Sequence, residues 1–179
     1  MTRRLNLAVR FSILSALICL CVFAKAAAQD KGLSDSAKLK KVNSMYAEYK
    51  ASFPDVPDIS AEQVLRRMEE GRVVFVDVRE TKEQIISMLP GAITKKAFLQ
   101  NPDVYKDYRV IGYCTISYRS GRLAQRLKKK GIHMLNLEGG ILAWLHAGGK
   151  VYRDGRPVNR VHVYGKKWDL APSGYETVR

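Results

Sequence analysis

The distribution of apolar residues predicts alternating strands and helices. Short apolar runs rich in β-branched residues occupy 73–78, 109–113 and 132–137, and their length and composition are typical of strands. Segments with apolar residues at helical spacing follow the last two runs, over 120–130 and 141–145. Because the run at 73–78 is continuous, the strand should be buried on both faces, as in parallel sheets. The pattern predicts an α/β protein with a single central parallel sheet and helices on both faces.

Polar residues indicate where further helices begin. Ser60 with Gln63, and Thr81 with Gln84, have the capping-box spacing that opens a helix. Residues 29–58 form a separate segment in this interpretation. Apolar residues recur at helical spacing between lysines over its second half, which predicts an amphipathic helix at the domain's edge and then a proline-containing connector.

The first 28 residues have the pattern of a secretory signal peptide. Three arginines precede an almost wholly apolar run, and small residues follow it at 24–28. We therefore expect cleavage near residue 28 and a periplasmic or secreted protein. An uncleaved membrane anchor is the alternative, although the apolar run is barely as long as the stretch of about 20 residues that a membrane-spanning helix needs.

Charge and cysteine content bear on the chemistry. The 179-residue chain has 31 Lys and Arg against 17 Asp and Glu, and loss of residues 1–28 leaves 27 against the same 17. This balance favours anionic substrates and partners. Cys19 and Cys21 leave with the signal, so the exported chain keeps Cys114 alone, and a lone cysteine in an oxidising compartment cannot form an internal disulfide.

Cys114 has two interpretations. Free cysteines are often inert residues of the core. This one, however, closes a predicted strand, is followed after four residues by Arg119, and precedes a helix that opens at Ser120. Loop N–H groups and the N-terminus of a helix favour a thiolate over a thiol and would hold an anionic group on its sulfur. The surroundings favour a reactive thiol.

Four motifs in order resemble a rhodanese (sulfurtransferase) domain over residues 59–158. They are Val76-Asp77-Val78-Arg79-Glu80, Leu89-Pro90-Gly91-Ala92, Tyr113-Cys114 with Arg119-Ser120-Gly121, and Glu138-Gly139-Gly140 with Ala143-Trp144. The resemblance implies an α/β domain whose cysteine takes sulfane sulfur from a small anionic donor. The sulfur is held as a persulfide and passed to a thiol or other nucleophilic acceptor.

Matched by motif, Cys114 is implied to be the catalytic sulfur carrier. The resemblance also implies an anion-binding role for Arg79 and a loop-closing role for Arg119, which would hold loop carbonyls and Asp77. Asp77 itself either belongs to the pocket or caps the turn after its strand. The loop that would surround the sulfur consists of Thr115, Ile116, Ser117, Tyr118 and Arg119.

The chain departs from the family pattern in ways that keep other functions open. Thr115 stands where thiosulfate-using members often have a basic residue, and Ser117 stands where glycine is frequent. A non-catalytic sulfide-carrying or protein-binding module is therefore one alternative. A phosphatase or arsenate reductase on the same scaffold is another, although relatives that bind phosphate generally have five loop residues between cysteine and arginine, and this chain has four.

We expect neither a cofactor nor a metal. The three histidines have no metal-ligand spacing, and the glycine pairs do not form a dinucleotide fingerprint. Nucleic acid is not an expected partner, since the basic run at 126–130 suits a solvated helix end. Residues 159–179 should wrap the domain with their aromatic side chains. This tail, or the amino-terminal helix, could instead bind a protein partner.

Overall fold

The computed structural model describes residues 32–68 and 71–179. The predicted signal peptide lies outside them. The unit from Asp35 to Arg179 contains, in order, α2 (Asp35–Lys50), β1 (Asp58–Ile59), α3 (Ala61–Arg67), β2 (Val73–Asp77), α4 (Thr81–Gln84), β3 (Ile93–Thr94), α5 (Lys95–Gln100), a 3₁₀ turn (Pro102–Tyr105) and β4 (Arg109–Tyr113). It continues with α6 (Tyr118–Lys128), β5 (Leu135–Leu137), α7 (Gly140–His146), β6 (Val151–Arg153), β7 (Arg156–Val158), β8 (Arg160–His162), a 3₁₀ turn (Lys166–Trp168) and β9 (Glu176–Val178).

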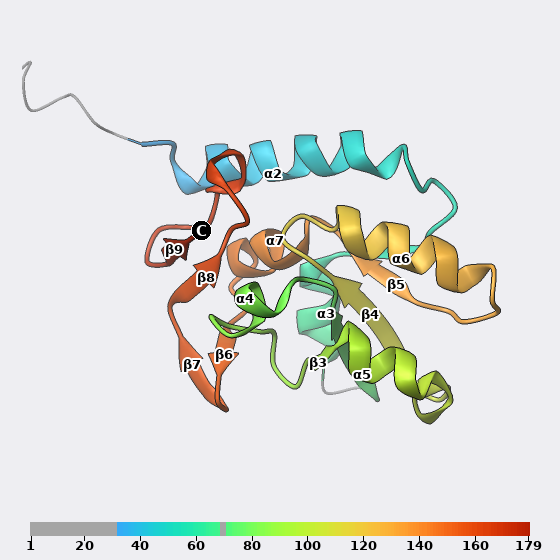
Figure 1. Ribbon diagram of the computed structural model, residues 1–179. Coiled ribbons are helices and arrows are strands. Elements are labelled where there is room, and N and C mark those ends of the chain that lie inside the picture. Colours follow the sequence, from blue (N-terminus) through green and yellow to red (C-terminus); the bar gives the residue numbers. More distant parts are fainter. Residues whose placement is uncertain (1–31, 69–70) are drawn as a thin grey trace, which may run out of the picture. The chain divides into compact units, whose positions relative to one another are not determined.

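The sheet is parallel and has the order β1-β5-β4-β2-β3 (Figure 1). Its central strands β4 and β2 pair over their whole length, from Val73 opposite Arg109 to Asp77 opposite Tyr113. The predicted α/β class with a central parallel sheet is confirmed. Because all strands run the same way, the carboxyl ends of β2 and β4 lie side by side, and this edge is where sites form in parallel sheets.

Helices cover both faces of the sheet. Alternate residues of β2 point to opposite sides, so Phe75 packs with α3, α7 and the C-terminal segment, whereas Val74 and Val76 pack with α5 and α6. Helix α2 contributes to both packed clusters, through Val42 and Tyr46. Burial on both faces is the physical reason for the continuous apolar run of β2.

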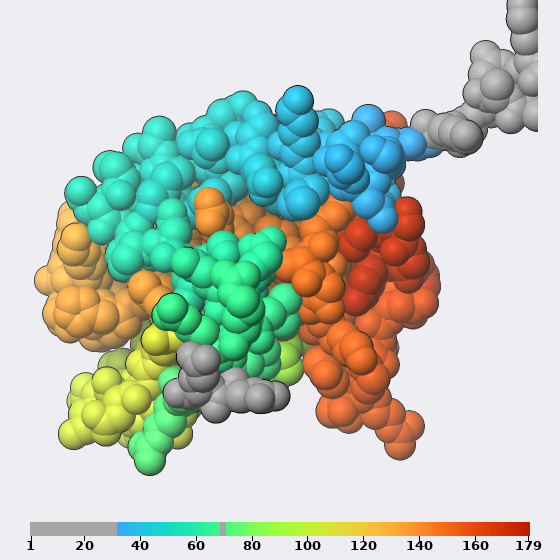
Figure 2. All heavy atoms as spheres, turned by 180° about the vertical axis from the view of Figure 1, so that it is seen from behind, coloured from blue at the N-terminus to red at the C-terminus, as the bar shows by residue number. Residues whose placement is uncertain are grey.

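Helix α2 and the C-terminal segment pack on the domain. In the view from behind, the atoms of α2 lie along the region that contains α7 and the end of the chain (Figure 2). The Lys38 ammonium donates to the Ala171 carbonyl at 3.0 Å, and Asp35 accepts from the Ser173 backbone at 2.8 Å. None of the helices in residues 32–68 and 71–179 is long and apolar enough to cross a membrane.

Three local expectations were inaccurate. The capping box at Ser60 and Gln63 is present, but the one expected at Thr81 and Gln84 lies one residue earlier, since the Glu83 side chain accepts from the Glu80 backbone. Helix α6 begins at Tyr118 rather than at Ser120, and β5 covers only 135–137 of the expected 132–137. The strand is short because it pairs with neighbours only from residue 135 onward.

Candidate functional site

Cys114 follows β4 directly and is almost completely buried, with 2 % of its surface exposed. It is a free cysteine. The three residues after it, Thr115, Ile116 and Ser117, are also buried. The first part of the predicted loop therefore lies inside the protein, at the carboxyl edge of the sheet, whereas Tyr118 is exposed.

The start of α7 holds the carbonyl groups of this loop. The Ile141 N–H donates to the Cys114 carbonyl at 2.9 Å, and the Leu142 N–H donates to the Thr115 carbonyl at 3.3 Å. Gly140 makes this approach possible. Its backbone has a left-handed φ of 62°, and a Cβ atom there would lie 2.4 Å from the Cys114 carbonyl oxygen.

The N–H groups of the loop are left for another acceptor. In a trans peptide the N–H points opposite to the carbonyl, so the N–H groups of Thr115 and Ile116 face away from α7. Among the described residues, no backbone hydrogen bond uses the N–H groups of residues 115–120. Ser117, with a φ of 65°, turns the chain into α6, whose first N–H groups belong to this set. The loop can receive an anion bound to the Cys114 sulfur.

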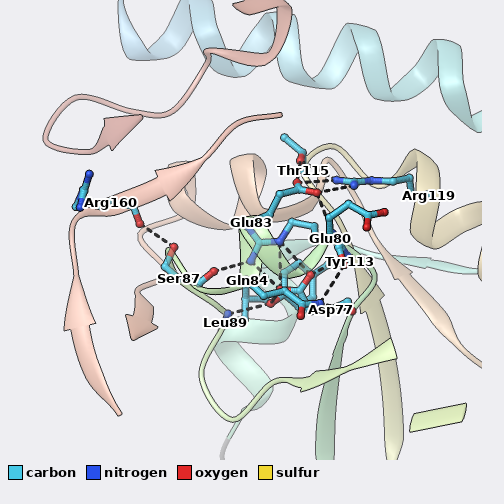
Figure 3. A network of polar contacts seen from close by, with 11 residues as sticks. Asp77, Glu80, Glu83, Gln84, Ser87, Leu89, Tyr113, Thr115, Arg119 and Arg160 are labelled. Atoms are coloured by element: carbon cyan, nitrogen blue, oxygen red, sulfur yellow. Dashed lines mark hydrogen bonds and ion pairs between the residues drawn. The ribbon is translucent and has the colours of Figure 1, made fainter. Parts of the chain in front are cut away.

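Arg119 closes the loop by binding Glu83. Its Nη1 donates to Glu83 Oε2 at 2.6 Å, and its Nη2 donates to Glu83 Oε1 at 2.8 Å (Figure 3). The same Nη2 donates to Thr115 Oγ1 at 3.2 Å, and that hydroxyl donates to Glu83 Oε1 at 3.2 Å. Arg119 was expected to hold loop carbonyls and Asp77, but its partners in the structure are Glu83 on α4 and the Thr115 hydroxyl.

Electrostatics keep this pair charged. Burial raises the pKa of Glu83, but hydrogen bonds from Arg119 and the Glu80 backbone, with the guanidinium charge, hold that pKa below its ordinary value. Burial lowers the pKa of Arg119, yet the hydrogen bond to Glu83 and the charge of that carboxylate raise it above its ordinary value. The guanidinium thus stays positive within reach of the Cys114 sulfur.

Arg79 does not face the pocket, contrary to the sequence-based expectation. Its side chain is fully buried and donates to both carboxylate oxygens of Asp77, at 2.9 Å from Nε and 2.7 Å from Nη2. Nη2 also donates to the Ser87 carbonyl at 2.5 Å. A buried guanidinium needs a carboxylate partner, and Asp77 supplies it two residues away. The alternative role of Asp77 as a cap is present, because its Oδ1 accepts the Arg79 backbone N–H at 3.0 Å.

Tyr113 extends this buried network to the segment after α4. Its hydroxyl donates to Asp77 Oδ2 at 2.6 Å and accepts the Leu89 N–H at 3.1 Å (Figure 3). Burial and the adjacent Asp77 charge raise the pKa of Tyr113, so the phenol stays protonated as a donor. Asp77 and Arg79 therefore brace the segment that follows α4, the helix that carries Glu83.

Asn136 of β5 braces the other end of the loop. Its amide donates to the Ser117 carbonyl at 3.3 Å and to the Tyr46 hydroxyl at 2.9 Å, and its oxygen accepts from Ser120 Oγ at 2.7 Å. The Tyr46 hydroxyl in turn donates to Asp58 at 2.6 Å. The loop is thus fixed to α6, β5 and α2 at once.

Cys114 opens onto a cavity of about 360 Å³. Its lining residues are Tyr49, Cys114, Thr115, Ile116, Tyr118, Arg119, Tyr164 and Trp168. Sequence reasoning identified the loop members of this set but missed Tyr49, Tyr164, Trp168 and the anchor Glu83. The sequence marks Glu83 only as an acidic residue in the first turn of a short helix, which does not point to Arg119. The described residues contain no group of three His, Cys, Asp or Glu suited to a metal ion.

Comparison with known proteins identifies the class. Residues 60–147 match the rhodanese-like domain family. A sulfurtransferase of Allochromatium vinosum is 32% identical over 98 residues, which cover 52% of this chain and 92% of that protein. This protein belongs to the rhodanese-like family.

Two further relatives share only part of their length with it. An uncharacterised protein of Synechocystis is 34% identical over 90 residues, which cover 48% of this chain and about half (49%) of the relative. The structure of a thiosulfate sulfurtransferase from Pseudomonas aeruginosa superposes with a TM-score of 0.53 at 24% identity and covers 65% of this chain but 23% of that one. The structural likeness supports the fold.

Proposed function

We propose that this protein is an exported sulfurtransferase that carries sulfane sulfur as a persulfide on Cys114. The observation that carries the proposal is the set of N–H groups of residues 115–120 that bond to no backbone acceptor among the described residues. They follow the cysteine directly and lie beside the positive charge of Arg119. Export rests on the signal pattern of residues 1–28.

The reaction has two balanced steps. In the first, the Cys114 thiolate attacks the sulfane sulfur of an anionic donor. The new sulfur–sulfur bond forms as the donor's bond to that sulfur breaks, and the remainder of the donor leaves with the electron pair. In the second, an acceptor nucleophile attacks the outer sulfur, and the Cys114 thiolate leaves. The loop N–H groups stabilise the charge on the outer sulfur between the steps, and neither step needs a cofactor.

Mass spectrometry tests the carrier role directly. Incubation with polysulfide or thiosulfate should add one sulfur atom to the peptide that contains Cys114, and Cys114→Ser should not be loaded. If no sulfur is added while a phosphomonoester is hydrolysed with dependence on Cys114, the proposal is wrong and the scaffold is a phosphatase. If no sulfane-sulfur donor, inorganic or organic, loads Cys114 and no phosphomonoester is hydrolysed, the proposal is equally wrong and the domain is a non-catalytic module.

Arg119→Lys tests the closing residue. Lysine keeps the charge but cannot donate to both oxygens of Glu83 at once. We expect sulfur transfer to fall about tenfold, the rate equivalent of 1.4 kcal/mol, because the loop is then held less firmly. Unchanged transfer would contradict the role of the paired geometry.

Export and cleavage of the signal segment are tested separately. The full chain, produced in a bacterium with an intact secretion system, should appear outside the cytoplasm without its first 26–28 residues. Mass spectrometry that finds Met1 on the mature protein would contradict cleavage and favour the anchor.

A further inference from the structure

Aromatic side chains form the walls of the cavity above Cys114. Tyr49 and Tyr118 pack with their ring centroids 5.3 Å apart, and Tyr164 and Trp168 form a second pair at the same distance. Cys114 itself is 2% exposed, so a reactant reaches its sulfur through this cavity. These walls offer far more apolar than polar surface to whatever enters.

Three of the four rings come from outside the family-matched region. Tyr49 belongs to α2, and Tyr164 and Trp168 belong to the C-terminal segment, whereas the match covers residues 60–147. The loop around the sulfur belongs to the shared domain, but the surface that a reactant meets belongs to the flanking segments of this chain. Selectivity for the reactant can therefore reside in those segments.

The charges at the cavity are positive. The Arg119 guanidinium lies 4.9 Å from the Tyr164 ring centroid, and the Lys167 ammonium lies 5.7 Å from that of Trp168. None of the described residues that line the cavity is acidic, although Arg119 is paired with the buried Glu83, and the Thr115 hydroxyl is already bonded to both. The cavity thus combines apolar walls with cations, which suits an anion that carries a hydrocarbon group.

We propose that the donor is an organic sulfane-sulfur anion, with an aryl or alkyl group that lies between these rings. The inference rests on the proposed sulfurtransferase function and specifies its substrate class. A cavity of about 360 Å³ is within the range of small-molecule sites, about 300–1,000 Å³, and a compact inorganic anion would leave its aromatic walls without contact.

Thiosulfonates provide matched probes for this proposal. The Cys114 thiolate attacks the terminal sulfur, the bond from that sulfur to the sulfonyl sulfur breaks, and the sulfinate leaves with the electron pair. Benzenethiosulfonate and methanethiosulfonate share this chemistry and differ in the group that would contact the rings. The rate of sulfur loading on Cys114 is measured for both compounds in single turnovers. Each rate is divided by the rate at which the same compound reacts with a free small thiol, which corrects for the different intrinsic reactivities of the two compounds.

The wild-type protein should prefer the phenyl compound at least tenfold after this correction. Tyr164→Gly should lower the preference, measured as the ratio of the two corrected rates, at least fivefold. Glycine suits this position because the Tyr164 backbone is left-handed, with a φ of 62°, and its side chain is exposed. Trp168→Leu is the second variant. Tyr108→Ala, which removes an exposed ring just before β4 and away from the cavity, is the control and should keep the preference.

The possible results distinguish a wrong substrate class from a wrong sulfurtransferase function. Equal corrected rates for the two compounds, or a preference that survives Tyr164→Gly and Trp168→Leu, would overturn the substrate class while leaving the sulfur carrier intact. Failure of thiosulfonates, thiosulfate and polysulfide alike to load Cys114 would overturn both.

Discussion

The buried carboxylate of Glu83 offers the sharpest test of how the loop after Cys114 is held. Its Oε1 accepts from Arg119 and Thr115, and its Oε2 accepts from Arg119 and the Glu80 backbone. The substitution Glu83→Gln keeps the shape of the side chain but leaves it one oxygen acceptor in place of two. At the Oε2 position the amide NH₂ group faces two N–H donors, and at the Oε1 position it faces Arg119 and the Thr115 hydroxyl, which can turn to accept. At least one hydrogen bond is therefore lost, and the Arg119 charge loses its carboxylate partner.

The structure sets the size of the effect. Breaking a buried ion pair by removing one charge costs about 3–5 kcal/mol. The Glu83 side chain is fully buried, but that of Arg119 is 26% exposed, so water can solvate part of the guanidinium. We therefore expect the free energy of unfolding to fall by about 2–3 kcal/mol, at or below the low end of that range. Sulfur loading should slow about tenfold, the rate equivalent of 1.4 kcal/mol, because Arg119 no longer holds the loop.

Urea unfolding followed by tryptophan fluorescence measures the stability, and single-turnover loading measures the rate. Glu62→Gln, which neutralises an exposed carboxylate in α3, is the matched control and should stay within about 0.5 kcal/mol of the wild type. If Glu83→Gln falls within the same margin and loads sulfur at the wild-type rate, the ion pair does not organise the loop and the reasoning is refuted.

Three further outcomes are expected. The pKa of Glu83 is held below its ordinary value, so its contribution to the free energy of unfolding is complete above about pH 4.3 and disappears as the pH falls through the lower pKa of the folded state. Urea titrations at decreasing pH should therefore show a steeper loss of stability for the wild type than for Glu83→Gln. Gly140→Ala should lose about 2–4 kcal/mol and most sulfur loading, whereas Gly91→Ala, equally left-handed with φ 63° but without a clash, should lose only about 1–2 kcal/mol. Ser117→Gly should raise the unfolding midpoint, with a gain of about 0.5–1 kcal/mol, because it relieves a left-handed backbone and removes a buried hydroxyl without a partner; a lower midpoint would contradict this.

The sheet and the loop could be predicted because their signals are local. The apolar runs of β2 and β4 give strands with nearly the expected bounds, and the spacing from Cys114 to Arg119 places the loop between strand and helix. The length of β5 could not be predicted in this way. Ile132 and Met134 satisfy a strand pattern, but a strand also needs neighbours, and the register with β4 begins only at Leu135.

The roles of charged residues depend on tertiary geometry that periodicity does not encode. Arg79 has a resident carboxylate two residues away, so burial turns a candidate anion ligand into a structural ion pair. Glu83 reaches Arg119 across 36 positions of sequence, from a helix of four residues whose position is set by the segment that Arg79 and Tyr113 fix. Such a partner becomes visible only when the fold places α4 over the loop.

The flanking segments take part in the site and are not separable attachments. In α2, Tyr46 joins the hydrogen bonds that fix the Ser117 carbonyl through Asn136, and Tyr49, three residues later on the same face, forms part of the cavity wall. The apolar side of α2 is thus occupied by its own domain, and a protein partner bound through this helix would meet its polar side. The C-terminal segment supplies the opposite wall, with Tyr164 in a left-handed backbone conformation. The family domain supplies Cys114 and its loop, and the segments on either side of it supply three of the four aromatic rings in the cavity wall.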